Sequence, residues 1–357
     1  MKVGIDISQM AFAGTGVASY TQNLVRSLLE IDKKNDYRLF FSSLRRKPPA
    51  EFKSVNLRFP PTFLEVLWNR LHVLPIERFL GRVDVFHSSD WLEPPTQCPK
   101  VTTVHDLVVF RYPQTLHPKI VKNQRRKLEW VRKETNLIIA VSESTKRDLV
   151  EILKISPKKI RVIYEATDPL FQKRLSPGRV NTVKKKYQLK KNYLLAVGTR
   201  EPRKNLKKVI EAFELLGRKD LDLVIAGKFG WGEDIKMANG KILGYVPKED
   251  LPGLYTAAEV FVYPSLYEGF GLPVLEAMAC GVPVVTSNTS SLPEVAGKAG
   301  VLVNPQESEA IAGGIEKALD QASELREKGF KQAQKFSWKK TAEQTLAVYR
   351  EVYVNRH

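Results

Sequence analysis

Short apolar strands alternate with longer amphipathic helices along the whole chain, and this alternation starts twice. The first series of expected strands comprises Lys2–Ser8, Tyr37–Phe41, Val83–His87, Val101–Val104, Leu137–Val141 and Arg161–Ile163. The second series comprises Tyr193–Val197, Leu221–Ala226, Ile242–Leu243, Val260–Tyr263, Val282–Thr286 and Gly300–Val303. Strands that alternate with helices form parallel sheets covered by helices. The pattern therefore predicts an α/β protein with two doubly wound domains.

The length of 357 residues agrees with two domains, because a single hydrophobic core rarely organises so long a chain. The stretch Asp168–Asn192 separates the two series and combines prolines and a glycine with weak periodicity, so we expect the interdomain linker there. The predicted domains are residues 1–175 and 176–340. Residues 341–357 follow as an amphipathic helix with apolar positions at Leu346, Val348, Tyr349 and Val352.

The composition is that of an ordinary enzyme of the cytoplasm. The sequence contains no run of about eighteen uncharged apolar residues, and it opens with a strand instead of the pattern of a signal peptide. Cys98 and Cys280 are the only cysteines, and neither belongs to a CxxC or Cys/His cluster. We therefore expect a cytoplasmic protein without disulfides or a metal site.

The net charge of +18 is concentrated in the N-terminal half, and much of it lies in the helical segment Lys119–Lys133. An anionic membrane or a phosphorylated acceptor would suit this segment, and the alternative is a solvated helix face. Specific binding to nucleic acid is not expected, because no recognition motif accompanies the charge. The segment Phe59–Leu80 is either an amphipathic element that faces lipid or acceptor, or a buried helix. Together the two segments suggest peripheral contact with the inner face of the cell membrane.

Glu268 and Glu276 lie eight positions apart around a glycine-rich loop that joins an apolar strand to a helix. Gly269 and Gly271 precede this helix, and Pro273 suits its first turn. The free amides and the positive dipole end of such a helix favour an anionic group such as a diphosphate. We expect Glu268 to reach ligand hydroxyls before the helix begins, and Glu276 to lie in the first turn, where it could also merely complement the dipole. This junction is the predicted active site.

In doubly wound sheets, ligands bind beyond the carboxyl ends of the strands, so two loops of the first series are informative. Gly14 and Gly16 follow the first strand, where they allow close approach to a ligand or form a tight turn. His105 and Asp106 follow a later strand. His105 either binds a substrate hydroxyl or transfers a proton, or it is a structural histidine beside a capping aspartate.

Two loops of the second series also carry polar residues. Arg200, Arg203 and Lys204 follow its first strand, where fixed cations would stabilise a departing diphosphate. Solvated surface charge is the alternative. The loop 286–297 offers several hydroxyls and Glu294, and its spacing alone assigns it no role.

Six motifs occur in order along nearly the whole chain: Gly14-Thr-Gly16, His105-Asp106, AVSESTKRDL (140–149), VIYEATDP (162–169), VGTREPRKN (197–205) and EGFGLPVLE (268–276). Together they resemble family 4 of the retaining glycosyltransferases, and the last motif, with its two glutamates separated by seven residues, is the most specific. The resemblance implies the GT-B fold, in which two Rossmann-like domains face each other across a cleft. It also implies a nucleotide-sugar donor bound mainly by the C-terminal domain, an acceptor held by the N-terminal domain, and catalysis without a metal ion or other cofactor.

The resemblance also assigns roles to individual residues. Glu268 would contact the donor sugar, Glu276 the ribose, and His105 the region of the transferred sugar, which makes His105 and Glu268 the expected catalytic residues. The other expected donor-binding residues are Gly14, Gly16, Arg203, Lys204, Gly269, Phe270, Gly271 and Leu272.

The chain departs from the family pattern at two places. Glu165-Ala166 stands where many relatives have Asn-Gly, and Thr199 stands where many have an arginine, which affects the expected phosphate contacts. The sequences VIYEATDP and VGTREPRKN and the segment around Trp91 most resemble the mannosyltransferase-like branch of bacterial surface-polysaccharide synthesis. GDP-mannose is therefore the expected donor, and a glycan or a polyprenyl-diphosphate-linked sugar the expected acceptor.

Two other classes stay open at this point. One is a different GT-B enzyme, such as a nucleotide-sugar epimerase or a phosphorylase, and the other is a non-catalytic binder of sugar nucleotides or nucleic acid. A phosphorylase of the glycogen type would need a longer chain and a lysine-linked pyridoxal phosphate. A non-catalytic relative should have lost Glu268, His105 or Lys204, and the sequence retains all three. An active glycosyltransferase is therefore the preferred interpretation.

Overall fold

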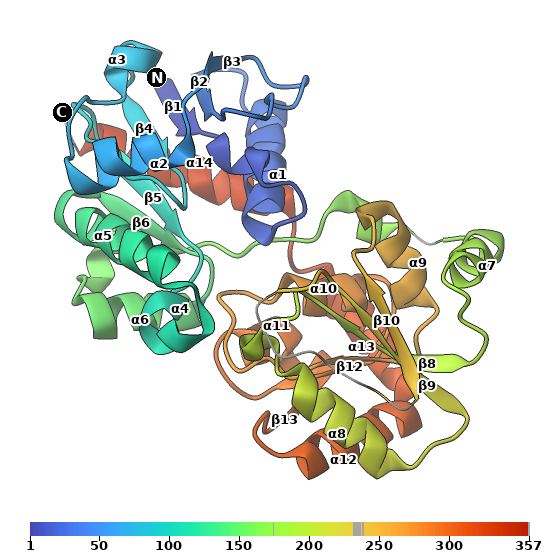
Figure 1. Ribbon diagram of the computed structural model, residues 1–357. Coiled ribbons are helices and arrows are strands. Elements are labelled where there is room, and N and C mark those ends of the chain that lie inside the picture. The colour runs from blue at the N-terminus through green and yellow to red at the C-terminus, as the bar shows by residue number, and fades with distance from the viewer. Residues whose placement is uncertain (174, 231–236, 238, 356–357) are drawn as a thin grey trace. The chain divides into compact units, whose positions relative to one another are not determined.

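The chain folds into two compact units. The computed structural model describes residues 1–173, 175–230, 237 and 239–355. The first unit comprises Met1–Glu165 and the C-terminal segment that begins at Trp338, and the second unit comprises Ala166–Ser337 (Figure 1). The last two residues of the predicted C-terminal helix lie outside the described residues.

The first unit contains a parallel sheet of seven strands in the order β3-β2-β1-β4-β5-β6-β7. Its strands are β1 (Lys2–Asp6), β2 (Asp36–Ser42), β3 (Ser54–Leu57), β4 (Val85–Ser88), β5 (Lys100–Val104), β6 (Leu137–Ala140) and β7 (Ile160–Val162). The sequence pattern predicted all of them except β3. This edge strand has no buried residue, so hydrophobic patterning did not reveal it.

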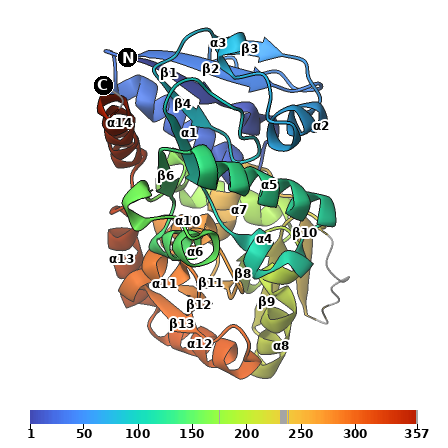
Figure 2. The ribbon, with the colours of Figure 1, turned by 90° about the vertical axis from the view of Figure 1, so that its left-hand side faces the viewer.

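Helices cover the strands of this sheet, most of which are buried along nearly their whole length. They are α1 (Gly16–Ile31), α2 (Pro61–Leu64), α3 (Glu77–Leu80), α4 (Val108–Arg111), α5 (Pro118–Glu134), α6 (Glu143–Leu153) and α14 (Trp338–Val354). A short π-helical segment, η2 (Glu65–Arg70), continues α2. The C-terminal helix α14 packs beside α1 (Figures 1 and 2). Its Tyr349 hydroxyl lies 2.7 Å from Nδ1 of His87 on β4.

The second unit contains a parallel sheet of six strands in the order β10-β9-β8-β11-β12-β13. The strands are β8 (Asn192–Val197), β9 (Leu221–Ala226), β10 (Gly240–Gly244), β11 (Val260–Tyr263), β12 (Val284–Ser287) and β13 (Gly300–Val303). Its helices are α7 (Pro177–Lys186), α8 (Leu206–Leu216), α9 (Leu251–Thr256), α10 (Leu272–Ala279), α11 (Leu292–Ala296), α12 (Ser308–Asp320) and α13 (Ala322–Ala333). One face of the sheet forms a hydrophobic core with α8 and α12, and Leu223, Val262 and Ile315 lie fully buried in it.

The division between the units falls at residue 165, ten residues before the predicted boundary at 175. Residues just after the division already contact the second unit: Asp168 pairs with Lys248 at 2.7 Å, and the ring of Phe171 lies 5.9 Å from that of Tyr255. The predicted linker also contains helix α7, which packs against α9. The second crossing of the chain falls at 337, three residues before the predicted position.

In both sheets the first strands are added on one side of the starting strand and the later strands on its other side. The place where the strand order reverses is called here the switch point. In the first unit this point lies between β1 and β4, and in the second between β8 and β11. In doubly wound proteins the loops after the two central strands diverge at such a point, and ligands bind there, at the carboxyl ends of the strands. The two switch points are therefore the places to search for functional side chains.

Candidate active site

The switch point of the second unit brings together the two most informative sequence motifs. After β8, the chain passes through Gly198 into a short 3-10 turn, η6 (Pro202–Lys204). After β11, it passes through the glutamate loop into α10. A Cβ atom on Gly227, which follows β9, would lie 1.7 Å from the carbonyl oxygen of Gly198. The loops after β8 and β9 therefore approach backbone to backbone, and only glycine fits at residue 227.

Glu268 is the centre of a buried ionic cluster. Its Oε1 atom accepts hydrogen bonds from the Lys204 ammonium at 2.7 Å, the Tyr263 hydroxyl at 2.9 Å and the Ser265 hydroxyl at 2.6 Å. Its Oε2 atom lies 2.8 Å from Nη1 of Arg203. Arg203 is also paired with Glu201 at 2.6 Å. The cluster thus fixes two cations and two carboxylates at the carboxyl end of β8 and β11.

The pKa values show how tightly this cluster holds its charges. Burial alone would raise the pKa of Glu268, but the neighbouring Arg203 and Lys204 outweigh burial and hold the value at about 2. Burial lowers the pKa of Lys204, and the charge of Glu268 opposes that shift. Burial and the Glu268 charge both raise the pKa of Tyr263 well above its usual value. At neutral pH the cluster therefore contains an ionised carboxylate and a hydroxyl that stays protonated.

The loop after β12, to which spacing alone assigned no role, supports the glutamate loop. The Ser290 hydroxyl accepts a hydrogen bond from the backbone N–H of Glu268 at 3.0 Å. The Ser291 hydroxyl donates to the carbonyl oxygens of Glu268 at 2.9 Å and Phe270 at 2.6 Å. The hydroxyl of Ser287, the last residue of β12, donates to the carbonyl oxygen of Ser265 at 2.6 Å. These bonds fix the backbone on which the Glu268 side chain depends.

Helix α10 begins at the glycine-rich end of the same loop. Gly271 is its N-cap residue with φ of 113°, a conformation that favours glycine, and no side chain caps the helix. Pro273 lies in the first turn, as the sequence predicted. Phe270 is buried and packs edge-on against Phe336, with ring centroids 5.7 Å apart. The first amides of α10 are thus suited to an anionic group beside the Arg203 and Lys204 cations.

Glu276 occupies a different environment from the one that the sequence predicted. Helix α10 begins at Leu272, so Glu276 is its fifth residue and lies beyond the first turn; the prediction of a first-turn position was wrong by about one residue. Its carboxylate accepts a hydrogen bond from the Tyr255 hydroxyl at 3.1 Å. Burial raises the pKa of Glu276 to about 7, and the hydrogen bond from Tyr255 offsets only part of that rise.

We expect Glu276 to make stability depend on pH. The folded protein keeps the Glu276 proton up to about pH 7, whereas the unfolded chain releases it near 4.5. The stabilisation by this proton is complete below about pH 4.5 and is lost as the pH rises through 7. The Glu276→Gln variant cannot ionise, so its melting temperature should rise relative to wild type by roughly 5 to 10 °C between about pH 5 and about pH 8, which corresponds to about 2.5 kcal/mol.

Thermal unfolding across that pH range measures this difference. The matched control is Glu214→Gln, which makes the same change at an exposed position on α8 and should keep a constant offset from wild type. A constant offset for Glu276→Gln would show that its carboxyl titrates as an ordinary exposed glutamate.

The remaining predicted residues lie in the first unit. Gly14 has φ of 86° in the turn after η1 (Ser8–Ala11), and Gly16 is the first residue of α1. Thr15 between them caps α1 by accepting a hydrogen bond from the Ala18 amide at 3.2 Å. Asp106 accepts a hydrogen bond from the Val108 amide at 3.0 Å, which is a structural role.

His105 forms a buried pair that the sequence reasoning missed. Its Nδ1 atom lies 2.8 Å from Oε1 of Glu165, and its ring lies edge-on to Tyr20 at 4.7 Å. Burial lowers the pKa of His105, but the hydrogen bond to Glu165 and its charge reverse that shift, so the net pKa is raised. The first departure from the family pattern, Glu165 in place of asparagine, is thus the residue that orients the histidine and favours its charged form.

The candidate site contains no arrangement typical of a metal centre. Among the described residues, the histidine, cysteine and carboxylate side chains form no group of three placed to bind a metal ion.

Two Rossmann-like units, with a cationic cluster and a helix N-terminus at the second switch point, define a glycosyltransferase of the GT-B class. Residues 180–336 match the family Glycosyl transferases group 1, and residues 14–169 match Glycosyltransferase Family 4. The chain is 34% identical to O-antigen chain mannosyltransferase B from Escherichia coli, over 98% of this chain and 100% of that protein. The chain therefore belongs to glycosyltransferase family 4, and it is a hexosyltransferase with O-antigen mannosyltransferases among its relatives.

Solved structures share the fold at lower sequence identity. Sucrose-phosphate synthase from Thermosynechococcus elongatus superimposes with a TM-score of 0.78 at 20% identity and covers 99% of this chain and 100% of its own. WaaG, a glycosyltransferase involved in lipopolysaccharide biosynthesis, gives a TM-score of 0.73 at 16% identity over 98% of this chain and 99% of its own. The similarity to a mannosyltransferase along nearly the whole chain, and not the shared fold, favours a hexosyltransferase over an epimerase, a phosphorylase or a non-catalytic binder.

Proposed function

We propose that this enzyme transfers mannose from GDP-mannose, with retention at the anomeric carbon, to a glycan or a polyprenyl-diphosphate-linked acceptor in the synthesis of a cell-surface polysaccharide. The mannosyl group is supported by the relative from Escherichia coli, which is similar along nearly the whole chain. The observation that carries the chemistry is the buried Glu268 cluster, because it fixes Arg203 and Lys204 beside the N-terminus of α10.

The cluster suits a leaving diphosphate. Arg203 and Lys204 have side chains that are only 13% and 12% exposed, so their charges act in a medium of low dielectric constant. When the bond between the sugar and the diphosphate breaks, negative charge develops on the leaving oxygen. Cations and amides that are already in place stabilise this charge without reorganisation. No metal ion is needed in this scheme.

The hydrogen bonds of Glu268 argue against a role as a covalent nucleophile. Its Oε1 atom already accepts three hydrogen bonds, and both oxygens face cations that lower its basicity. Within the described residues, Oε2 contacts only Arg203, so it retains a lone pair for a hydroxyl of the donor sugar. In the proposed reaction the acceptor oxygen bonds to the anomeric carbon on the face that the diphosphate leaves, and the acceptor proton passes to the leaving phosphate oxygen.

A panel of nucleoside diphosphates tests the donor assignment. Thermal unfolding is measured with GDP, UDP, ADP and dTDP in the presence of a chelator, because the proposed site works without metal. A ligand at a hundredfold excess over its Kd should stabilise the protein by about 2.7 kcal/mol. We expect the largest shift with GDP. UDP is the nucleotide present in the structure of Anabaena HepE, and a preference for UDP would mean that a UDP-sugar is the donor at the same site. No shift with any nucleotide would overturn the proposed donor site.

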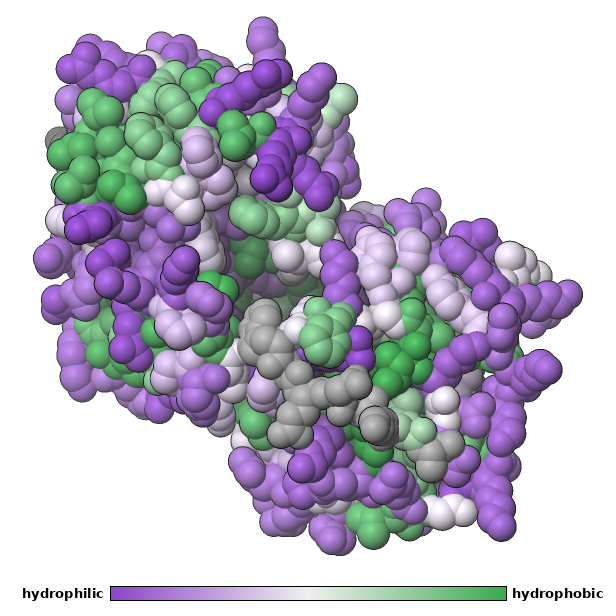
Figure 3. Space-filling model, viewed as in Figure 1, coloured by the Kyte–Doolittle hydropathy of each residue, from purple (hydrophilic) through white to green (hydrophobic). Residues whose placement is uncertain are grey.

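We also propose that the first unit contacts anionic lipid at the cytoplasmic face of the membrane. The segment Phe59–Leu80, predicted to be either an amphipathic element or a buried helix, has both properties. Leu64 and Trp68 are buried, whereas nearby apolar side chains are exposed. The exposed group, called here the apolar patch, consists of Phe63, Val66, Leu71, Val73 and Leu74. Figure 3 shows hydrophobic side chains gathered over this part of the unit. No helix in the described ranges has the length and hydrophobicity to cross a bilayer.

The basic helix α5 packs on the segment that carries the apolar patch. Helix α5 packs on η2 through the Trp130 indole, which donates to the Asn69 carbonyl at 3.0 Å and stacks on His72 at 3.6 Å. Lys122 and Lys133 on α5 are exposed, whereas Lys127 is buried and faces Glu93 at 4.0 Å. An apolar patch beside exposed cations is complementary to the interface of an anionic bilayer.

Vesicle flotation tests the membrane contact. At low salt, wild-type protein should float with vesicles that contain phosphatidylglycerol and should stay behind with pure phosphatidylcholine. Leu71→Glu should reduce flotation severalfold, and Leu215→Glu is the matched control because its side chain is equally exposed on α8 of the other unit. Equal recovery with both kinds of vesicle would contradict the proposal.

A further inference from the structure

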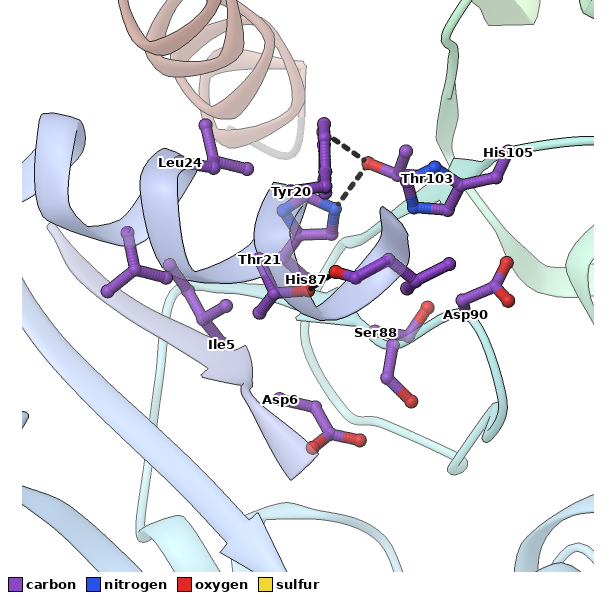
Figure 4. A pocket seen from close by; sticks show the side chains of 13 residues that line it. Ile5, Asp6, Tyr20, Thr21, Leu24, His87, Ser88, Asp90, Thr103 and His105 are labelled. Atoms are coloured by element: carbon purple, nitrogen blue, oxygen red, sulfur yellow. Dashed lines mark hydrogen bonds between the residues drawn. The ribbon is translucent and has the colours of Figure 1, made fainter. Parts of the chain in front are cut away.

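His105 offers one of its two ring nitrogens to a ligand. The side chain is 13% exposed and lines a small polar pocket together with Tyr20, His87 and Thr103 (Figure 4). Its Nδ1 atom faces Oε1 of Glu165 at 2.8 Å. Its Nε2 atom forms no hydrogen bond with any described residue. The protein therefore holds the ring through Nδ1 and leaves Nε2 able to bind a substrate.

The contacts of the imidazole ring fix its orientation. Glu165 is 3% exposed and lies in the loop after β7. The Thr341 hydroxyl on α14 donates to the carbonyl oxygen of Tyr164 at 2.8 Å, which anchors the backbone next to the carboxylate. The ring of Tyr20 lies edge-on to the imidazole with centroids 4.7 Å apart, and the Tyr20 hydroxyl lies 3.0 Å from Oγ1 of Thr103. A buried carboxylate and a fixed aromatic ring thus hold the imidazole through two independent contacts.

The partner of Nδ1 determines what Nε2 can do. A carboxylate only accepts hydrogen bonds, so Nδ1 of His105 carries a proton in the neutral ring and in the charged ring. In the neutral ring Nε2 has a lone pair and can only accept, whereas in the charged ring Nε2–H donates. Asparagine, the residue of the family pattern at position 165, would bring no charge to this contact. The negative charge of Glu165 favours the charged ring, and with it a donor at Nε2.

Other titratable groups near His105 reinforce this preference. The groups that face the ring are Tyr20 on α1, His87 on β4, Asp90 after β4, Asp106 in the loop of the histidine itself, and Glu165. Burial lowers the pKa of His105, but the Glu165 hydrogen bond and the charges of the three carboxylates outweigh burial, so the net pKa is raised. Burial lowers the pKa of His87 to about 3 and raises that of Tyr20, so both groups are neutral near pH 7. Neither of them opposes a positive charge on His105 at that pH.

We infer that Glu165 is a positioning residue that keeps His105 protonated on both ring nitrogens, so that Nε2 donates a hydrogen bond to an oxygen atom of a substrate. The inference rests on the proposed function and adds to it a residue and the protonation state of the histidine. Glu165 acts through His105 and does not itself touch the substrate. The active enzyme contains the charged ring, so turnover falls when the ring loses its second proton at higher pH.

NMR measures the ionisation of His105 without any donor chemistry. The chain has five histidines, so isotope labelling of histidine follows each ring against pH, and His105→Gln identifies the signal of residue 105. Glu165→Gln keeps the shape of the side chain and removes its charge, so the midpoint of the His105 titration should fall at least about one pH unit below wild type. Glu30→Gln, the same change at an exposed position on α1, should leave the midpoint unchanged.

The pH profile of turnover tests whether the charge is used. With GDP-mannose as donor, kcat of wild type should fall on the alkaline side. Glu165→Gln should lose at least about fivefold in kcat at about pH 8, and most of that loss should disappear at about pH 6, where the histidine regains its second proton. A merely structural defect would lower kcat equally at both pH values. Glu30→Gln should follow wild type at every pH.

A second variant keeps the inference testable if Glu165→Gln does not fold. Glu165→Asn also removes the charge, and asparagine is the residue of the family pattern at this position. Equal His105 midpoints in wild type and variant, or a loss of kcat that does not depend on pH, would overturn the inference. If GDP-mannose is not a substrate, only the donor assignment fails. The midpoints, together with the pH profile for the nucleotide sugar that the enzyme does accept, then decide the role of Glu165.

Discussion

Replacing Glu268 with alanine should lower turnover at least tenfold and should also destabilise the second unit. The carboxylate is the common partner of Arg203 and Lys204, so its removal leaves two buried cations with fewer partners. Breaking a buried ion pair from one side costs on the order of 3 kcal/mol. In a unit of this size, that cost corresponds to a fall in melting temperature of roughly 5 to 10 °C. A tenfold loss of turnover corresponds to about 1.4 kcal/mol of transition-state stabilisation.

Two variants separate catalysis from stability at this position. Glu268→Gln keeps the shape of the side chain and can accept hydrogen bonds at Oε1, so it should retain more stability than alanine while turnover stays low. Glu214→Ala removes an exposed glutamate from α8 and should change neither quantity. An alanine variant at 268 with full activity would show that the donor site lies elsewhere.

The Lys204→Ala variant should lose at least tenfold in turnover and should destabilise the second unit less than Glu268→Ala does. Removal of Lys204 takes one cation from the buried Glu268 carboxylate, which still pairs with Arg203. The hydrogen bonds of Lys204 to Glu268 at 2.7 Å and to Tyr263 at 2.5 Å hold it at the predicted diphosphate position. Loss of the charge should raise the barrier to departure of the diphosphate and weaken binding of GDP.

Steady-state kinetics and GDP titration compare the turnover and GDP affinity of Lys204→Ala with those of Lys207→Ala. The control variant removes an exposed lysine from the first turn of α8. Lys207→Ala should keep wild-type turnover and GDP affinity. Normal turnover in Lys204→Ala would remove this lysine from the mechanism, even if GDP still bound to the second unit.

Sequence reasoning predicted the fold well because both sheets are buried and parallel. Nine of the thirteen strands contain mostly buried residues, and such strands appear in a sequence as short apolar runs between helical patterns. The edge strand β3 has no buried residue and was missed for that reason. The residues just after 165 contain prolines typical of a linker, yet Asp168 and Phe171 already make contacts of the second unit.

The site was predicted less completely than the fold. Glycines, charged residues and their order along the chain indicated where Glu268, Arg203 and Lys204 belong, because motifs after neighbouring strands meet at one edge of a sheet. The sequence did not indicate that these three residues bind one another, since their pairing joins loops some sixty positions apart.

The contacts of several other side chains near the strand ends could not be predicted from the neighbouring sequence. Glu165 was noted only as a departure from a family pattern, and its pairing with His105 joins two different strand ends of the first sheet. Asp6 lies within the predicted strand Lys2–Ser8, and the sequence assigned it no role. Its burial became visible only with the geometry. The supporting serines of loop 286–291 are likewise ordinary loop residues until their hydrogen bonds are seen.

The central claim is the transfer of mannose from GDP-mannose with retention, and the most direct measurement is the reaction itself. Purified enzyme is incubated with GDP-mannose and methyl α-mannoside in the presence of a chelator, released GDP is quantified, and the anomeric configuration of the product is determined by NMR. The account predicts release of GDP together with an α-linked dimannoside. A β-linked product would contradict retention, and transfer only from another nucleotide sugar would contradict the assignment of GDP-mannose as donor.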